Sequence, residues 1–242
     1  MEYNNELNFG PAMSRERELS MSQAFPVLMR KVYVWMTFAL AITGICAYGV
    51  ASSPGIINAL YSNQAIMWGI VIAELALVFG ISAAINRLSL TTATMLFVLY
   101  SALNGVMLSS IFMVYTTSSI ASVFFITAGT FAVMAFIGYT TKTDLTSMGK
   151  ILMMALIGMI IASLVNVFLV KSTGFDLILS YVGVLVFVGL TAYDSQKIKQ
   201  MLLEAPDAGE TAQKVALLGA LSLYLDFINL FIYLLRIFGK RE

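Results

Sequence analysis

The 242-residue chain contains no histidine and a single cysteine, Cys46. Without histidine it cannot build a histidine-ligated metal site, a Ser–His or Cys–His nucleophile, or a heme site with a histidine ligand. Without a second cysteine it can form no internal disulfide. Any cation that the chain binds must therefore use oxygen ligands, which favours hard ions or protons.

Charged side chains are also scarce. They make up 11% of the residues, hydrophobic residues make up 60%, and the mean hydropathy is +0.88, whereas an average soluble domain has about 25% charged residues. The net charge is only +1 and there is no basic arm, so nucleic acid is not an expected partner. The composition predicts an integral membrane protein whose main partner is the lipid bilayer.

The first 23 residues differ from the rest because they are polar and mixed in charge. They contain no apolar stretch followed by a cleavage site, so they are not expected to be a signal peptide. We predict a flexible tail at 1–23 and a membrane domain at 24–242.

Runs of about 20 apolar residues, the length that crosses a bilayer as a helix, recur through the membrane domain. They predict an all-α fold with seven spans, at 32–51, 66–85, 92–115, 120–139, 151–170, 177–193 and 216–238. Only 116–119 separates the third span from the fourth, which predicts a tight antiparallel hairpin. The only long internal polar loop is expected at 195–215.

Lysine and arginine are distributed unequally between the two ends of these spans. The N-terminal side has Arg15, Arg17, Arg30, Lys31, Arg87, Lys142, Lys150, Lys197, Lys199 and Lys214, and the other side has Lys171, Arg236, Lys240 and Arg241. Since basic residues gather in cytoplasmic loops, we expect a cytoplasmic N-terminus. The C-terminus is then outside, unless the seventh segment is re-entrant.

The seventh segment carries a stripe of polar and small residues. Its members alternate in steps of three and four, so they share one helix face; they are Gly219, Ser222, Asp226, Asn229, Tyr233 and Arg236. A charged side chain at mid-bilayer costs about 2.5–3.5 kcal/mol even on lenient scales and by default indicates a function. Asp226, in the middle of the segment, is therefore the first candidate site residue.

Asp194 ends the sixth span on the side where the seventh begins, so the two carboxylates can approach each other. Two carboxylates in one dry site cannot both ionise cheaply, so such a pair would exchange protons as a unit and act as a pH sensor. When deprotonated, Asp194 and Asp226 would offer oxygen ligands for transient binding of Ca²⁺. The alternative is that Asp194 only caps the sixth helix beside Lys197 or Lys199.

Further polar residues are candidate gate or pore partners of this pair: Glu74, Arg87, Ser222, Asn229, Tyr233 and Arg236. Glu74 could pair with Arg236 or Arg87, or line a cavity, and Arg87 could instead be a cytoplasmic anchor. Asn104 is expected to form an interhelical hydrogen bond. Small residues four apart, such as Ser101 and Gly105 on the third span and Gly158 and Ala162 on the fifth, predict close helix packing.

Four sequence stretches resemble those of a known family. SLYLDFINLFIYLLRIFG at 222–239 and TAYDSQKIK at 191–199 are similar to motifs of the Bax inhibitor family, also called the transmembrane BAX inhibitor motif family. RKVYVWMTFALAITG at 30–44 and GYTTKTDL at 138–145 resemble its bacterial branch. The resemblance runs from about residue 25 to the end of the chain.

The resemblance implies seven transmembrane helices, with the last helix central within three helix hairpins. It also implies a pH-sensitive calcium leak governed by two aspartates, which fall on Asp194 and Asp226. In some members an arginine at the end of the second helix engages this pair, and its match here is Arg87. We therefore expect a channel of the bacterial inner membrane that passes Ca²⁺ and senses protons, without enzymatic activity or a cofactor.

Two other functions are compatible with the sequence. The chain could regulate a membrane protease or a stress-response protein by binding it through the tail before Arg30 and the loop 195–215. It could also be an intramembrane aspartyl protease, because two membrane aspartates can form a catalytic dyad. However, Leu-Tyr-Leu precedes Asp226, where such proteases usually have Gly-x-Gly.

Overall fold

The computed structural model describes residues 11–205 and 209–241, with side chains from residue 23 onward. Within these ranges the secondary structure is helical, apart from an isolated bridge between Tyr115 and Arg241. The elements are α1 Pro11–Ala51, α2 Pro54–Ser62, α3 Gln64–Ala84, α4 Leu90–Leu108, η1 Ser109–Met113, α5 Thr117–Thr140, α6 Thr146–Val165, η2 Asn166–Val170, α7 Thr173–Leu203 and α8 Glu210–Phe238.

The described part of the chain has seven helices that are long and apolar enough to cross a membrane, as predicted. They are α1, α3, α4 with η1, α5, α6 with η2, α7 and α8. Many large apolar side chains on the outer helices are exposed, and only 6% of the most apolar part of α3 and 11% of that of α6 are buried. These helices turn their apolar faces outward, where lipid would cover them.

The predicted loop at 195–215 is wrong. Helix α7 continues to Leu203 and α8 begins at Glu210, so only 204–209 connects them, and 206–208 lie outside the described residues. The polar composition of this segment is that of an amphipathic helix, because Ile198 and Leu202, one turn apart, are 4% and 0% exposed. The two helices extend beyond the lengths that hydropathy alone predicts.

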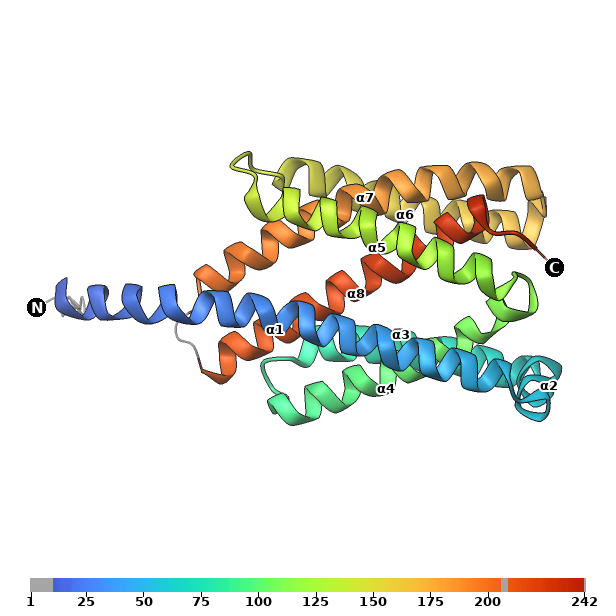
Figure 1. The fold of residues 1–242 in the computed structure, drawn as a ribbon, viewed down its shortest axis with the longest axis horizontal. Coiled ribbons are helices and arrows are strands. Elements are labelled where there is room, and N and C mark those ends of the chain that lie inside the picture. Colours follow the sequence, from blue (N-terminus) through green and yellow to red (C-terminus); the bar gives the residue numbers. More distant parts are fainter. Residues whose placement is uncertain (1–10, 206–208, 242) are drawn as a thin grey trace, which may run out of the picture.

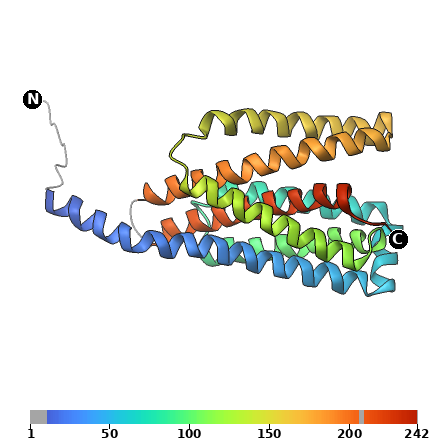
Figure 2. The ribbon, with the colours of Figure 1, turned by 45° about the horizontal axis from the view of Figure 1, so that its top comes forward.

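The start of the chain also differs from the prediction. Helix α1 begins at Pro11, inside the segment predicted as a tail, and its first turns project beyond the other helices (Figures 1 and 2). Residues 1–10 lie outside the described residues, so a flexible tail there stays a prediction. The link after α1 contains the short helix α2, which begins at Pro54, a position where a missing backbone N–H costs nothing.

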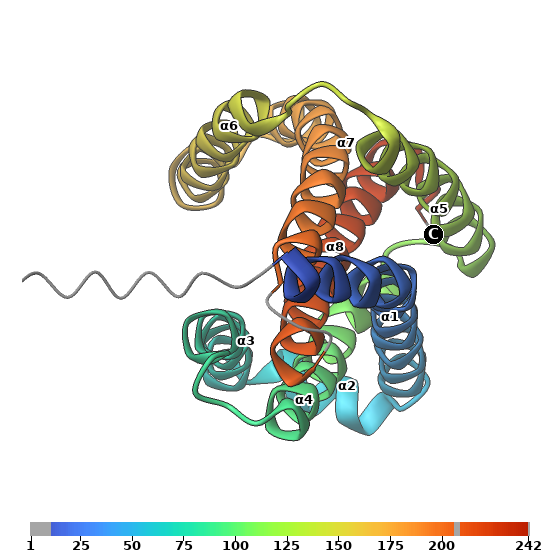
Figure 3. The ribbon, with the colours of Figure 1, turned by 90° about the vertical axis from the view of Figure 1, so that its left-hand side faces the viewer.

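Helix α8 is the centre of the bundle. It packs against α1, α4, α5 and α7, and 67% of its most apolar part is buried (Figure 3). The hairpins α1–α3, α4–α5 and α6–α7 surround it. Figure 1 shows that α8 runs as one helix between opposite ends of the bundle, so it does not turn back as a re-entrant segment would.

The hairpins open around α8 instead of closing on themselves. The connection from η1 to α5 comprises only 114–116, as tight as predicted, yet α4 and α5 diverge from it, and α1 packs mainly on α4 and α8. Gly105 permits the close α1–α4 approach, since a Cβ there would lie 2.7 Å from the Cβ of Cys46. The packing predicted for Gly158 is wrong, because nothing lies within 4 Å of its Cβ position.

Candidate functional site

The polar stripe of α8 faces α7. A Cβ built on Gly219 would lie 2.9 Å from a side-chain carbon of Ile198, and a Cβ built on Gly183 would lie 2.7 Å from the ring of Tyr233. These two contacts, one near each end of the interface, show that α7 and α8 run antiparallel. Gly219 and Tyr233 both belong to the predicted stripe, so the stripe follows this interface from Gly219 to Tyr233.

This register brings the two predicted aspartates together. Asp194 lies at the level of Ser222, and Asp226 lies about one helical turn, roughly 5 Å, further along α8. The two carboxyl groups interact electrostatically across the interface. The long antiparallel contact between α7 and α8 therefore brings Asp194 and Asp226 together. This contact continues past the expected end of the sixth span.

The two carboxyl groups have different surroundings. Asp226 is 4% exposed, and its Oδ2 is buried without a hydrogen-bond partner. Asp194 is partly buried and lines a cavity of about 200 Å³ together with Ser82, Lys197 and Ser222. An unpaired buried oxygen is costly, and a proton or a cation at Asp226 would remove that cost.

The alternative role of Asp194, as a cap of the sixth helix, placed it beside Lys197 or Lys199. Neither lysine forms an ion pair with Asp194. Lys197 is exposed and lies 5.7 Å from the centre of the Tyr193 ring, while Lys199 donates to the backbone oxygen of Tyr139 at 2.9 Å. In the described part of the chain, the only ion pair joins Lys214 to Glu210. Neither aspartate thus forms an ion pair within these described ranges, although Lys197 lines the same cavity as Asp194.

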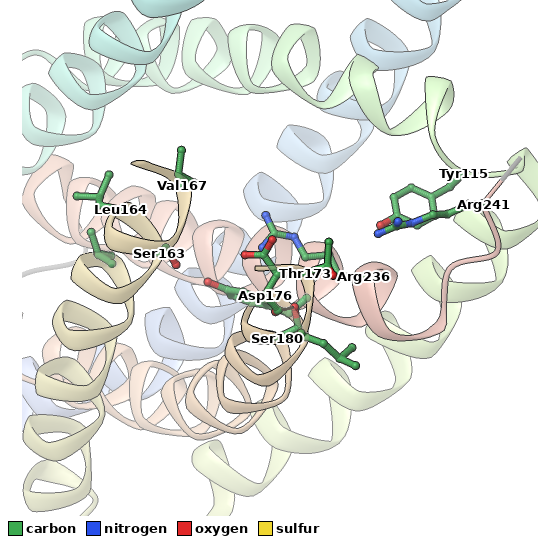
Figure 4. A pocket seen from close by; sticks show the side chains of 13 residues that line it. Tyr115, Ser163, Leu164, Val167, Thr173, Asp176, Ser180, Arg236 and Arg241 are labelled. Atoms are coloured by element: carbon green, nitrogen blue, oxygen red, sulfur yellow. Dashed lines mark hydrogen bonds between the residues drawn. The ribbon is translucent and has the colours of Figure 1, made fainter. Parts of the chain in front are cut away.

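The remaining stripe residues continue from this site toward the other end of α8. Asn229 is partly buried and donates to the backbone oxygen of Leu225 at 2.8 Å. Tyr233 stacks on Phe187, and the Arg236 guanidinium lies 5.6 Å from the centre of the Tyr233 ring. Tyr233 and Arg236 line a second, larger cavity of about 850 Å³ (Figure 4). The stripe thus runs between the two cavities, with Asp226 in its middle.

Arg87 and Glu74 lie apart from the aspartate pair. The Arg87 side chain is exposed between α3 and α4 and forms no ion pair within the described ranges. Glu74 is partly buried on α3, near Tyr100, Asn104 and Tyr224, and its Oε1 is buried without a partner. Glu74 is paired with neither arginine, so it belongs to a different polar cluster.

Tyr224 is the centre of this second cluster, and the sequence analysis missed it. Its side chain is 0% exposed, its hydroxyl donates to Asn104 Oδ1 at 3.1 Å, and it lies 2.7 Å from Thr43 Oγ1. Thr43 in turn donates to the backbone oxygen of Ser101 at 2.9 Å. The position of Tyr224 in the middle of an apolar helix could have indicated this cluster, because a tyrosine buried in a membrane helix needs a hydrogen-bond partner. The predicted interhelical bond of Asn104 is confirmed.

Comparisons with known proteins agree with this architecture. The family model described as "Inhibitor of apoptosis-promoting Bax1" matches residues 26–242. The "Inner membrane protein YbhL" of Escherichia coli strain K12 is 54% identical over 216 residues, which cover 88% of this chain and 92% of the relative. Uncharacterized proteins of Borreliella burgdorferi and Deinococcus radiodurans are 48% and 38% identical, covering 88% and 96% of this chain and 92% and 96% of the respective relatives.

Proposed function

Because the chain belongs to the Bax inhibitor family and is a multi-pass protein of the inner membrane, we propose that it is a pH-sensitive Ca²⁺ leak gated by Asp194 and Asp226. The observation that carries the proposal is the buried Asp226 carboxyl, whose Oδ2 has no partner, beside a second carboxyl that reaches a cavity. The site offers a place for a proton or a cation, because no lysine or arginine forms an ion pair with either carboxyl group among the described residues.

The path follows the polar stripe of α8. Ions enter at the cavity lined by Asp194 and Ser222 and then pass Asp226 and Asn229 toward the opposite end of α8. Among the described residues no group of three or more acidic or cysteine side chains could hold a metal ion. Two carboxylates would bind Ca²⁺ weakly. Weak binding suits conduction, because a conducted ion must bind and then leave.

The orientation of the path follows from the charge asymmetry. With the N-terminus in the cytoplasm, the Asp194 cavity opens on the cytoplasmic side and the Arg236 cavity on the outer side. Protonation would then set the charge of the inner part of the path, where Asp194 and Asp226 lie.

A non-enzymatic role agrees with the same geometry. A catalytic aspartate pair must present both carboxyl groups to one water molecule and a peptide. Asp226 does not line the cavity that Asp194 lines, so the arrangement favours a buried proton switch over hydrolysis.

The test is Ca²⁺ flux into liposomes that contain the purified protein, measured in mildly acidic and mildly alkaline buffer. We expect Asp226→Asn and Asp194→Asn each to bring the ratio of the two fluxes to about 1, because an amide cannot exchange the proton. The matched control is Asp144→Asn, which changes an exposed carboxylate outside the spans and should keep the wild-type ratio. Wild-type pH dependence in both aspartate variants would place the gate elsewhere.

A further inference from the structure

The larger cavity lies at the end of the bundle opposite the start of α1. Its volume of about 850 Å³ is within the range of small-molecule sites, about 300–1,000 Å³. Side chains from α6, η2, α7, α8, the C-terminal segment and the connection between η1 and α5 line it (Figure 4). Arg236 and Tyr233 of the polar stripe line it, whereas Asp194 and Asp226 do not.

Two arginines give this cavity a positive charge. Arg236 and Arg241 both line it, and neither forms an ion pair within the described residues. The backbone holds Arg241 in place, because Thr116 N donates to Lys240 O at 3.1 Å and Lys240 N donates to Ser119 Oγ at 2.9 Å. The C-terminal segment is thus fastened across the end of the bundle with a guanidinium at the cavity.

The cavity wall also contains one carboxylate, Asp176, which is held at the corner between α6 and α7. Asp176 Oδ1 accepts from Asn166 Nδ2 at 2.6 Å, and Asn166 is 2% exposed. Asn166 also donates to Ser172 O at 3.1 Å and accepts from Ser172 N at 3.0 Å, which holds the corner where Lys171 adopts a φ of 52°. Asp176 therefore stabilises the α6–α7 corner and forms no ion pair with either arginine. Two guanidinium groups and one carboxylate leave the lining with a net positive charge that attracts an anion.

The opposite wall of the cavity is apolar and open. Ile160, Leu164 and Val167 line it, although their side chains are 52%, 51% and 62% exposed. Among the long helices, α6 packs mainly against α7 and lies at the edge of the bundle (Figure 3). In a membrane, this side of the cavity would face the acyl chains of lipids.

From this combination we propose that the cavity binds an anionic phospholipid, with its phosphate on Arg236 and Arg241 and an acyl chain along Leu164 and Val167. Guanidinium groups pair well with phosphate oxygens, often through two hydrogen bonds. Both arginines lie near the C-terminal end of α8, beside the α6–α7 corner, where a helix leaves the hydrocarbon and headgroups begin. A free anion would use the arginines but not the apolar wall.

The test is native mass spectrometry of the purified full-length protein mixed with equal amounts of phosphatidylglycerol and phosphatidylcholine. We expect preferential retention of one phosphatidylglycerol molecule. Arg236→Gln and Arg241→Gln should each weaken retention about tenfold, as expected for loss of a charged hydrogen bond. Lys240→Gln is the matched control, since it removes a neighbouring exposed cation that does not line the cavity.

A variant of the apolar wall separates a lipid from a free anion. Leu164→Trp fills the open side and should weaken phosphatidylglycerol retention without altering the elution volume of the protein. Equal retention of both lipids, equal effects of Lys240→Gln and the arginine variants, or full retention by Leu164→Trp would each overturn the proposal. So would complete displacement of the lipid by inorganic phosphate at an equal concentration.

Discussion

At the residue scale, the hydrogen bonding of each buried polar side chain of α8 depends on the groups that the facing helix provides. Tyr224 finds two oxygen partners, Asn104 and Thr43, whereas Asp226 has an oxygen with none. The two residues are two positions apart, so they point to roughly opposite sides of the helix. The satisfied hydroxyl stabilises the bundle, and the unsatisfied carboxyl is the group available for a proton or an ion.

Tyr224→Phe should lower the stability of the protein by about 1 kcal/mol, because it leaves Asn104 Oδ1 and Thr43 Oγ1 without the hydroxyl. The measurement is the midpoint of thermal unfolding in detergent. Tyr181→Phe removes a hydroxyl from an exposed ring and should leave the midpoint unchanged. An equal midpoint for Tyr224→Phe and wild type would show that the cluster contributes no stability.

Asp144 offers a pH test outside the spans. Hydrogen bonds from the hydroxyl and the backbone N–H of Thr146 hold the pKa of Asp144 below its ordinary value of 3.8. Since the folded-state pKa is lowered, the stabilisation is fully present above 3.8 and is lost as the pH falls through the lowered value. An NMR titration of the carboxyl carbon should give a pKa below 3.8, and Thr146→Ala should raise it. A pKa that does not move in this variant would contradict the assignment.

At the scale of elements, glycines decide how closely two helices approach. A Cβ on Gly138 of α5 would overlap the carbonyl oxygen of Ala192 on α7 and lie 2.8 Å from its Cα. This contact is with backbone, which cannot rotate away as a side chain can. It also lies two residues from Asp194, so the α5–α7 contact helps to position the candidate site.

Gly138→Ala should destabilise the protein by about 1–3 kcal/mol, as overpacking does. Gly158→Ala is its control, because the same methyl group on α6 meets open space and should be neutral or stabilise the helix by up to about 1 kcal/mol. Unfolding in detergent compares the two variants. The packing argument fails if both variants have the same midpoint.

At the scale of the whole molecule, the central position of α8 lets one helix serve two polar systems. One side faces α7 with the aspartate pair, and the other faces α1 and α4 with the Tyr224 cluster. The ends of the α7-facing side reach two different cavities, one lined by Asp194 and Lys197 and one lined by Asp176 and two arginines. The proposed leak depends on the Asp194 end of α8, and the proposed lipid site depends on the Arg236 end.

The sequence by itself determined the seven spans, the polar stripe of the last helix and the buried position of Asp226. These features depend on hydropathy and on spacings of three and four residues, which lie within one helix. The family could also be identified from short motifs around Asp194 and Asp226.

Only the tertiary structure decided which groups from different helices meet. It placed Asp194 one turn from Asp226, grouped Glu74 with Tyr224 and not with an arginine, and brought Arg236 and Arg241 to one cavity. It also packed Gly138 tightly and left Gly158 open. The physical reason is that the rotation and register of packed helices depend on contacts between distant residues, which no local pattern of spacing contains.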